Sequence, residues 1–61
     1  MRKDLQQARK AKALSMQDMA DVIGVTKSAY GNIEAGRRNP SVSVAIRIAQ
    51  FLDKPVEYLF R

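Results

Sequence analysis

The chain contains neither histidine nor cysteine, the two residue types that most often serve as general base, thiolate nucleophile or metal ligand. It also has no glycine-rich phosphate loop and no pair of carboxylates set in an evident cleft. Disulfides and thiolate metal sites are therefore excluded, and we expect no enzyme activity, no bound metal and no cofactor. Hydrogen bonding and charge are the chemistry that remains.

The polar side chains best suited to hydrogen bonding share one face of a helix predicted over residues 27–35. On a helical wheel of about 100° per residue, the inward face carries Thr26, Ala29, Tyr30 and Ile33. The outward face carries Lys27, Ser28, Gly31, Asn32 and Ala35. This face has one cation and no carboxylate, with Glu34 at its edge, whereas a solvated helix is normally fringed with Glu and Lys. A face this slim fits the major groove of B-DNA.

Helical apolar spacing predicts five short helices and no strand, an all-α fold. The expected ranges are 2–12, 16–23, 27–35, 42–52 and 56–60. Three hydroxyl residues are expected to cap helix N-termini: Ser15, Thr26 and Ser41. Asp18, three residues after the first of them, indicates a capping box. Two glycines are expected to end helices in the left-handed conformation: Gly24 and Gly36.

The apolar stripes of these helices predict the core of one small domain over residues 1–61, and 46% of the chain is hydrophobic. The first helix is expected to bury Leu5, Ala8 and Ala11. The second is expected to bury Met19, Ala20 and Ile23. The fourth is expected to bury Val42, Ala45, Ile46, Ala49 and Leu52.

The net charge of +5 is spread unevenly, with +4 in residues 1–12 and −2 in residues 13–26. A small basic domain most often meets nucleic acid, although a ribosome-associated protein or a membrane-surface peptide shares that charge. We interpret the basic side chains of residues 1–12 as a solvated face. With no signal-peptide pattern and no run of ~20 apolar residues, we expect a cytoplasmic protein that does not contact a membrane.

Residues 16–35 form two predicted helices joined by the three-residue turn Gly24-Val25-Thr26, which is a helix-turn-helix pattern. The small side chain of Ala20 lets the two helices approach closely, and Ile33 fills the space between them. A tight corner in any helical bundle could use the same residues, so this pattern alone leaves the function open.

The turn is one of several motifs that follow each other in a fixed order. They are Leu5 with Arg9, Leu14-Ser15, Met19-Ala20, Gly24-Val25-Thr26, Ile33-Glu34, Gly36-Arg37-Arg38-Asn39-Pro40-Ser41, Ile48-Ala49 and Leu59-Phe60. Over nearly the whole chain this set resembles the XRE, or Cro/repressor-like, helix-turn-helix proteins of bacteria and phages. The resemblance implies a compact, lambda-repressor-like five-helix bundle. It also implies a sequence-specific DNA-binding transcriptional regulator, expected to be a repressor, that puts helix 27–35 into the major groove.

Site residues follow from the resemblance by position. Base edges would be contacted by Lys27, Ser28 and Asn32. The DNA backbone would be contacted by Gln17, Thr26, Arg37, Arg38 and Asn39. An ion pair is implied between Arg9 and Glu34.

The sequence also departs from the family pattern. Met16 stands where the family usually has a phosphate-binding Gln, so the neighbouring Gln17 is the expected substitute. Ala35 stands where Asn is common. Gly31, in the middle of the helix, either admits the DNA backbone or a thymine methyl closely or is drift, and the sequence does not choose between these.

Apolar side chains near the C-terminus exceed what so small a core needs. The candidates for a symmetric dimer contact are Phe51, Val56, Tyr58 and Phe60. Alternatively, Phe51 and Tyr58 could complete the core around Leu59 and Phe60. A homodimer would match a palindromic operator, with its two reading heads about 34 Å apart. The alternative is an antitoxin-type protein that holds a toxin through its C-terminal helices while repressing its own operon.

Overall fold

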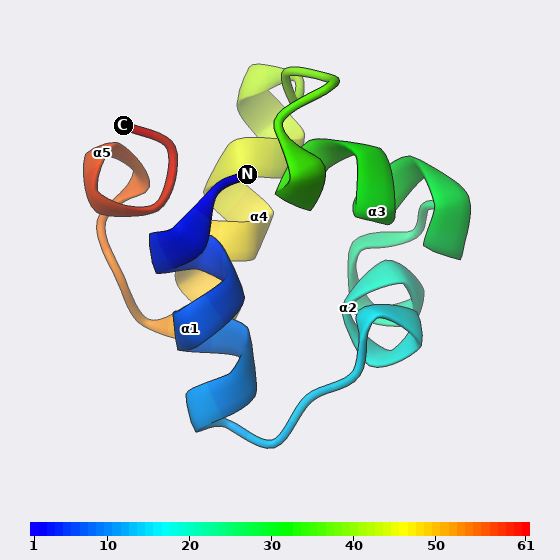
Figure 1. Ribbon diagram of the computed structural model, residues 1–61, viewed down its shortest axis with the longest axis horizontal. Coiled ribbons are helices and arrows are strands. Elements are labelled where there is room, and N and C mark those ends of the chain that lie inside the picture. Colours follow the sequence, from blue (N-terminus) through cyan, green and yellow to red (C-terminus); the bar gives the residue numbers. More distant parts are fainter.

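Five helices make up the regular structure of the chain, and the computed structural model describes all residues 1–61 (Figure 1). In chain order they are α1 (Lys3–Ala11), α2 (Met16–Ile23), α3 (Lys27–Ala35), α4 (Val42–Leu52) and α5 (Val56–Leu59). Every helix lies within one residue of its predicted bounds, so the all-α prediction is confirmed. The longest, α4, has 11 residues, and none of the five has the length and apolar character that a membrane span needs.

The predicted capping box begins α2. The Ser15 hydroxyl accepts a hydrogen bond from the main-chain N–H of Asp18 at 3.0 Å, and an Asp18 carboxylate oxygen accepts from the main-chain N–H of Ser15 at 2.9 Å. The bond from the Ser15 main-chain N–H lowers the pKa of the Asp18 carboxyl group, because it favours the charged form of that group. The start of α2 is therefore fixed by two residues that are close in sequence.

The turn between α2 and α3 is also set by local signals. Gly24 adopts the left-handed conformation with φ +85°, and the Thr26 hydroxyl accepts a hydrogen bond from the main-chain N–H of Ala29 at 3.0 Å. Gly36 ends α3 with φ +83°, and Ser41 caps α4. Two left-handed residues were not predicted: Ala13, after α1, with φ +55°, and Asp53, at the end of α4, with φ +57°.

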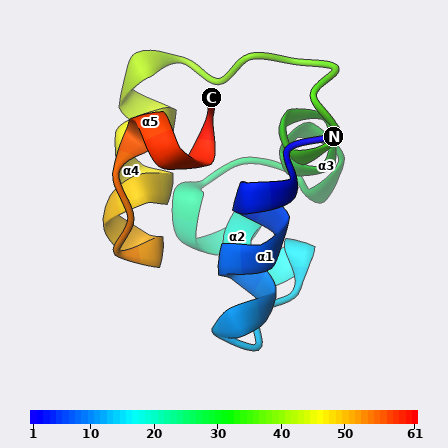
Figure 2. The ribbon, with the colours of Figure 1, turned by 60° about the vertical axis from the view of Figure 1, so that its left-hand side comes forward.

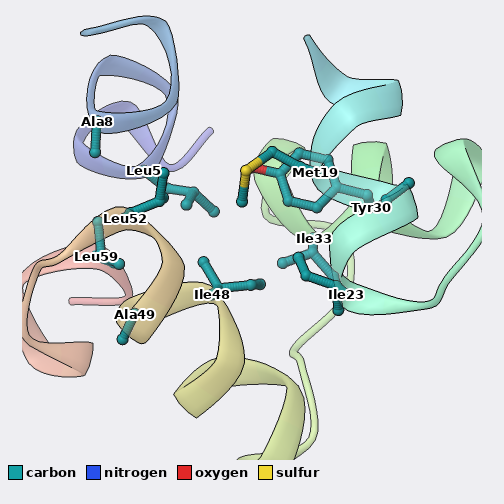
Figure 3. Packing of buried hydrophobic residues seen from close by; sticks show 11 residues of the cluster. Leu5, Ala8, Met19, Ile23, Tyr30, Ile33, Ile48, Ala49, Leu52 and Leu59 are labelled. Atoms are coloured by element: carbon teal, nitrogen blue, oxygen red, sulfur yellow. The ribbon is translucent and has the colours of Figure 1, made fainter. Parts of the chain in front are cut away.

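The five helices surround one apolar core. α2 packs against α3 and α4, α1 packs against α3 and α5, and α5 lies on α4. Figure 2 shows the N-terminus of the chain beside α3. The side chains of Leu5, Met19, Tyr30 and Ile48 meet at the centre of the core and are fully buried (Figure 3). α3 is therefore held from its inward side, by Tyr30 and Ile33, and its opposite side is left open.

The predicted buried stripe of α4 was right at Ala45, Ala49 and Leu52 and wrong at two other positions. Ile46 is 44% exposed and Val42 is exposed as well, whereas Ile48 is completely buried. The buried positions are Ala45, Ile48, Ala49 and Leu52. They follow the i, i+3, i+4, i+7 spacing of a single helix face, which α2 and α5 cover. Because α4 is apolar on more than one side, its sequence alone did not fix the face that turns inward.

The stripe of α1 needs one correction too. Ala11 is exposed, and the buried residues are Leu5, Ala8 and Arg9. These three positions share a face at i, i+3 and i+4, so Arg9 takes the inward place at the C-terminal end of the helix. A charged residue can fill that place because it has a buried partner, Glu34 of α3.

Candidate nucleic-acid interface

The open side of α3 presents the face that the helical wheel predicts. Lys27 and Ser28 are exposed and Asn32 is half-buried. Ser28, Asn32 and Gly31 border a shallow hollow that Met16 and Arg37 also line. A Cβ atom on Gly31 would lie 3.8 Å from the sulfur of Met16, an ordinary contact, so packing does not require glycine here. Because Gly31 has no side chain, the surface is recessed in the middle of this face.

The carboxylate nearest to this face is turned away from it. The wheel placed Glu34 at the edge of the outward face, but its side chain is only 1% exposed and is bound by Arg9 of α1. The guanidinium donates from Nε to Oε2 and from Nη2 to Oε1, both at 2.9 Å. Its third donor, Nη1, reaches the carbonyl oxygen of Leu14 at 2.7 Å. The bonds to Glu34 raise the pKa of Arg9.

This pair therefore does two things. It ties α1 to the C-terminal half of α3 by a bidentate contact across 25 residues of sequence. It also withdraws the one carboxylate of α3 from the outward face, which leaves that face without a negative charge. The structure thus brings together the two residues for which the family resemblance implies an ion pair.

Tyr30 is a buried neighbour of Arg9 and Glu34. Its hydroxyl is buried and has no hydrogen-bond partner. Burial, and after it the neighbouring Glu34 carboxylate, raises the pKa of Tyr30 well above its ordinary value. The ring therefore contributes to the core as an apolar group, while its hydroxyl carries an uncompensated desolvation cost.

We expect Tyr30→Phe to leave the free energy of unfolding unchanged or to raise it by about 1 kcal/mol, because it removes a buried polar group that bonds nothing. Chemical denaturation followed by circular dichroism measures the effect. Tyr58→Phe is the control at a half-buried tyrosine and should change stability by no more than about 0.5 kcal/mol. A clear loss in Tyr30→Phe alone would mean that the hydroxyl is bonded in solution.

The segment after α3 turns back onto the end of the helix. The left-handed Gly36 reverses the chain, and the main-chain N–H of Arg37 donates to the carbonyl oxygen of Asn32 at 3.0 Å. The Arg37 side chain follows the same direction, with Nη1 donating to Oδ1 of Asn32 at 3.0 Å. Arg37, a predicted contact to the DNA backbone, is therefore hydrogen-bonded to Asn32, a predicted contact to a base.

Arg2 is the residue of this region that the sequence did not reveal. Its main-chain N–H donates to the Glu34 carbonyl oxygen at 2.8 Å, and its Nε donates to the Ile33 carbonyl oxygen at 2.9 Å. Its Nη2 donates to Oδ1 of Asn39 at 2.9 Å, and the guanidinium lies 5.4 Å from the centre of the Phe60 ring. Arg2 thus joins α3, the following loop and the C-terminus, so the basic N-terminus is not wholly a solvated face.

The other residues predicted to contact the DNA backbone are exposed, but some of their polar atoms already make hydrogen bonds within the chain. Gln17 donates from Nε2 to Oδ1 of Asp21 at 2.8 Å, within α2. The hydroxyl oxygen of Thr26 accepts the capping bond, which leaves its hydrogen to donate elsewhere. Asn39 accepts from Arg2, so its Nδ2 group is the donor left over. Arg38 is exposed, and its side chain makes no hydrogen bond or ion pair within the chain.

The sequence model of a family described as helix-turn-helix matches residues 5–59, nearly the whole of this structure. The chain belongs to this family. The resemblance to XRE-type helix-turn-helix proteins is thus confirmed, and α2, the turn at Gly24 and α3 are its helix-turn-helix. Within it, Met16, at the position where Gln is usual in the family, packs partly against the core.

Several helix-turn-helix proteins are similar to this chain. YqaE of Bacillus subtilis (strain 168), named an uncharacterized HTH-type transcriptional regulator, is 40% identical over 95% of this chain and 50% of that protein. MJ0272 of Methanocaldococcus jannaschii, with the same description, is 32% identical over 98% of this chain and 91% of that protein. The crystal structure of the restriction-modification controller protein C.AhdI from Aeromonas hydrophila matches with a TM-score of 0.82 and 34% identity, over 95% of this chain and 88% of that one. The chain spans about half the length of its Bacillus subtilis relatives YqaE and YobD.

The C-terminal side of the helix-turn-helix domain carries the predicted dimer residues. Three of them, Val56, Tyr58 and Phe60, pack partly against the core, so the alternative prediction of a core role holds for Tyr58 but not for Phe51. Phe51 is 37% exposed. Three other large apolar side chains are exposed on α2 and α4, namely Val22, Val42 and Ile46. The exposed large apolar side chains of this side therefore lie on α4 and at the end of α2, and none of them lies on α5.

Proposed function

We propose that this chain is a sequence-specific DNA-binding transcriptional regulator, with residues 1–61 acting as one unit that lays α3 in the major groove. The observation that carries the proposal is the outward face of α3, which is slim and polar and holds no carboxylate because Glu34 is buried against Arg9. The names of its relatives, HTH-type transcriptional regulators, support the same function.

The proposed contacts divide by chemistry. The base edges are contacted by Lys27, Ser28 and Asn32. Lys27 donates to O6 and N7 of guanine or to a phosphate, and Asn32 binds adenine through its amide. The DNA backbone is contacted by Gln17, Thr26, Arg37, Arg38 and Asn39. Among these the exposed guanidinium of Arg38 and the free amide of Asn39 have the donors most available for phosphate oxygens.

The proposed mechanism is repression in the cytoplasm, by a homodimer that covers a promoter. A symmetric dimer suits a palindromic operator whose half-sites are about 34 Å apart. The exposed apolar side chains of α4, among them Phe51 and Ile46, support self-association, because burying them would stabilise so small a domain.

Selection from a randomised DNA duplex pool, at near-physiological salt and with excess non-specific competitor, tests this function. We expect an enriched inverted repeat, whose half-site spacing gives the separation of the two α3 helices. A single enriched half-site would support sequence recognition but contradict the dimer. Salt-sensitive binding without any enriched sequence would contradict the proposed function itself.

A pair of variants tests the division of contacts. Asn32→Ala is expected to reduce discrimination at one or two base positions by ~1–3 kcal/mol, because it removes a base-reading amide. Arg38→Ala is expected to weaken binding to all duplexes alike and to reduce the salt slope by about 1, because it removes one phosphate contact. Titrations against duplexes with single base changes, at several salt concentrations, measure both. Unchanged base preference in Asn32→Ala would show that α3 is not the reading element.

A further inference from the structure

The hydrogen bond between Arg37 and Asn32 changes what Arg37 can do. A guanidinium has donors only, so the amide atom facing Arg37 Nη1 at 3.0 Å must be the carbonyl oxygen Oδ1 and not the nitrogen. Chemistry thus settles the orientation of this amide, which in an asparagine without such a partner can turn over. The bond leaves both hydrogens of Nδ2 and one lone pair of Oδ1 for another group.

Arg37 is itself held in place. Its main-chain N–H and that of Arg38 both donate to the Asn32 carbonyl oxygen, at 3.0 and 3.2 Å. Further along the loop, Arg2 donates to Oδ1 of Asn39 at 2.9 Å and is itself bonded to the end of α3. The loop is therefore anchored on both sides of Arg37, and its side chain starts from a fixed point next to Asn32.

We propose that Arg37 is a positioning residue that sets the base preference of Asn32, an inference that rests on the proposed function. Adenine offers an acceptor, N7, beside a donor, the N6 amino group, and an amide matches this pair in only one orientation. Arg37 fixes the amide with Oδ1 on a defined side. Without it the amide can turn over, and its Nδ2 group can then donate a single hydrogen bond to O6 of guanine, which stands where adenine has its N6 amino group.

Arg38 provides the matched control, because it is the adjacent residue of the same loop, carries the same charge, and its side chain bonds nothing within the chain. The duplex selected by the wild-type protein is varied at the base pair whose preference Asn32→Ala abolishes. Arg37→Met and Arg38→Met each remove one cation and keep a side chain of similar length. Affinities are measured for both, and for Arg37→Met in the Asn32→Ala background.

We expect both arginine variants to lower affinity and the salt slope to a similar extent. Only Arg37→Met should reduce the preference for adenine over guanine at the Asn32 position, by about fivefold or more. In the Asn32→Ala background the same substitution should change no base preference. Equal thermal unfolding of the two arginine variants shows that the fold is intact in both.

A second measurement needs no DNA. The order parameter of the Asn32 side-chain amide, from nitrogen-15 relaxation, should fall in Arg37→Met and stay at its wild-type value in Arg38→Met. The proposal is overturned if Arg37→Met weakens all duplexes alike, or if the Asn32 amide is equally ordered in both variants. If the wild-type protein enriches no DNA sequence, the proposed function itself is overturned. The role of Arg37 in base preference is then overturned too.

Discussion

The Arg9→Met variant is expected to lose about 3–5 kcal/mol of unfolding free energy, because it leaves the Glu34 carboxylate buried and unpaired. Glu34 is 1% exposed and both of its oxygens accept from Arg9, so no water can take the place of the guanidinium without opening the core. The Leu14 carbonyl oxygen loses its donor too. Since a domain of this size has only about 3–5 kcal/mol to lose, thermal unfolding followed by circular dichroism should find it largely unfolded.

The chain offers a matched control in its second ion pair. Arg61 bonds Asp4 at 3.2 Å, but its side chain is 65% exposed, and Arg61→Met should therefore cost at most about 1 kcal/mol. The double variant Arg9→Met/Glu34→Leu should recover most of the loss, because an apolar pair can replace a buried ion pair. If Arg9→Met and Arg61→Met lost equally little unfolding free energy, Glu34 would have to be hydrated in solution. The claim that Glu34 is turned away from the outward face of α3 would then be wrong.

The parts of this fold that could be predicted are those decided by neighbours in sequence. A capping box needs only Ser15 and Asp18, and a left-handed helix end needs only Gly24 or Gly36. The outward face of α3 was predictable for the same reason, because helix geometry fixes which residues share a side. Family resemblance then supplied the one long-range contact that was expected, between Arg9 and Glu34.

The parts that could not be predicted depend on residues far apart in sequence or on a choice between equivalent faces. Arg2 bonds the carbonyl oxygen of Ile33 and the amide of Asn39, 31 and 37 residues away, and nothing around Arg2 in the sequence marks it. The bond from Arg37 to Asn32 spans only five residues, yet it arises from the reversal at Gly36 and from the rotamers of two polar side chains. Hydrophobic spacing carries no information on either.

The α4 helix is the clearest case of such a choice, and it gives the second large effect. Ile48→Ala is expected to cost 2–5 kcal/mol, because Ile48 is fully buried among Leu5, Met19 and Tyr30 and its truncation leaves a cavity. Ile46→Ala, two residues earlier and 44% exposed, should cost about 0.5 kcal/mol or less. Chemical denaturation at low protein concentration compares the two free energies directly.

The comparison separates the two faces of one helix, since both variants delete the same atoms and have the same change in helix propensity. The reverse order of costs would mean that α4 presents the stripe predicted from sequence, with Ile46 inward. Equal costs would mean that a second surface covers Ile46 in solution. Dilution then decides whether that surface belongs to another copy of the chain, because a contact between copies makes the loss in Ile46→Ala depend on protein concentration, whereas a contact within the chain does not.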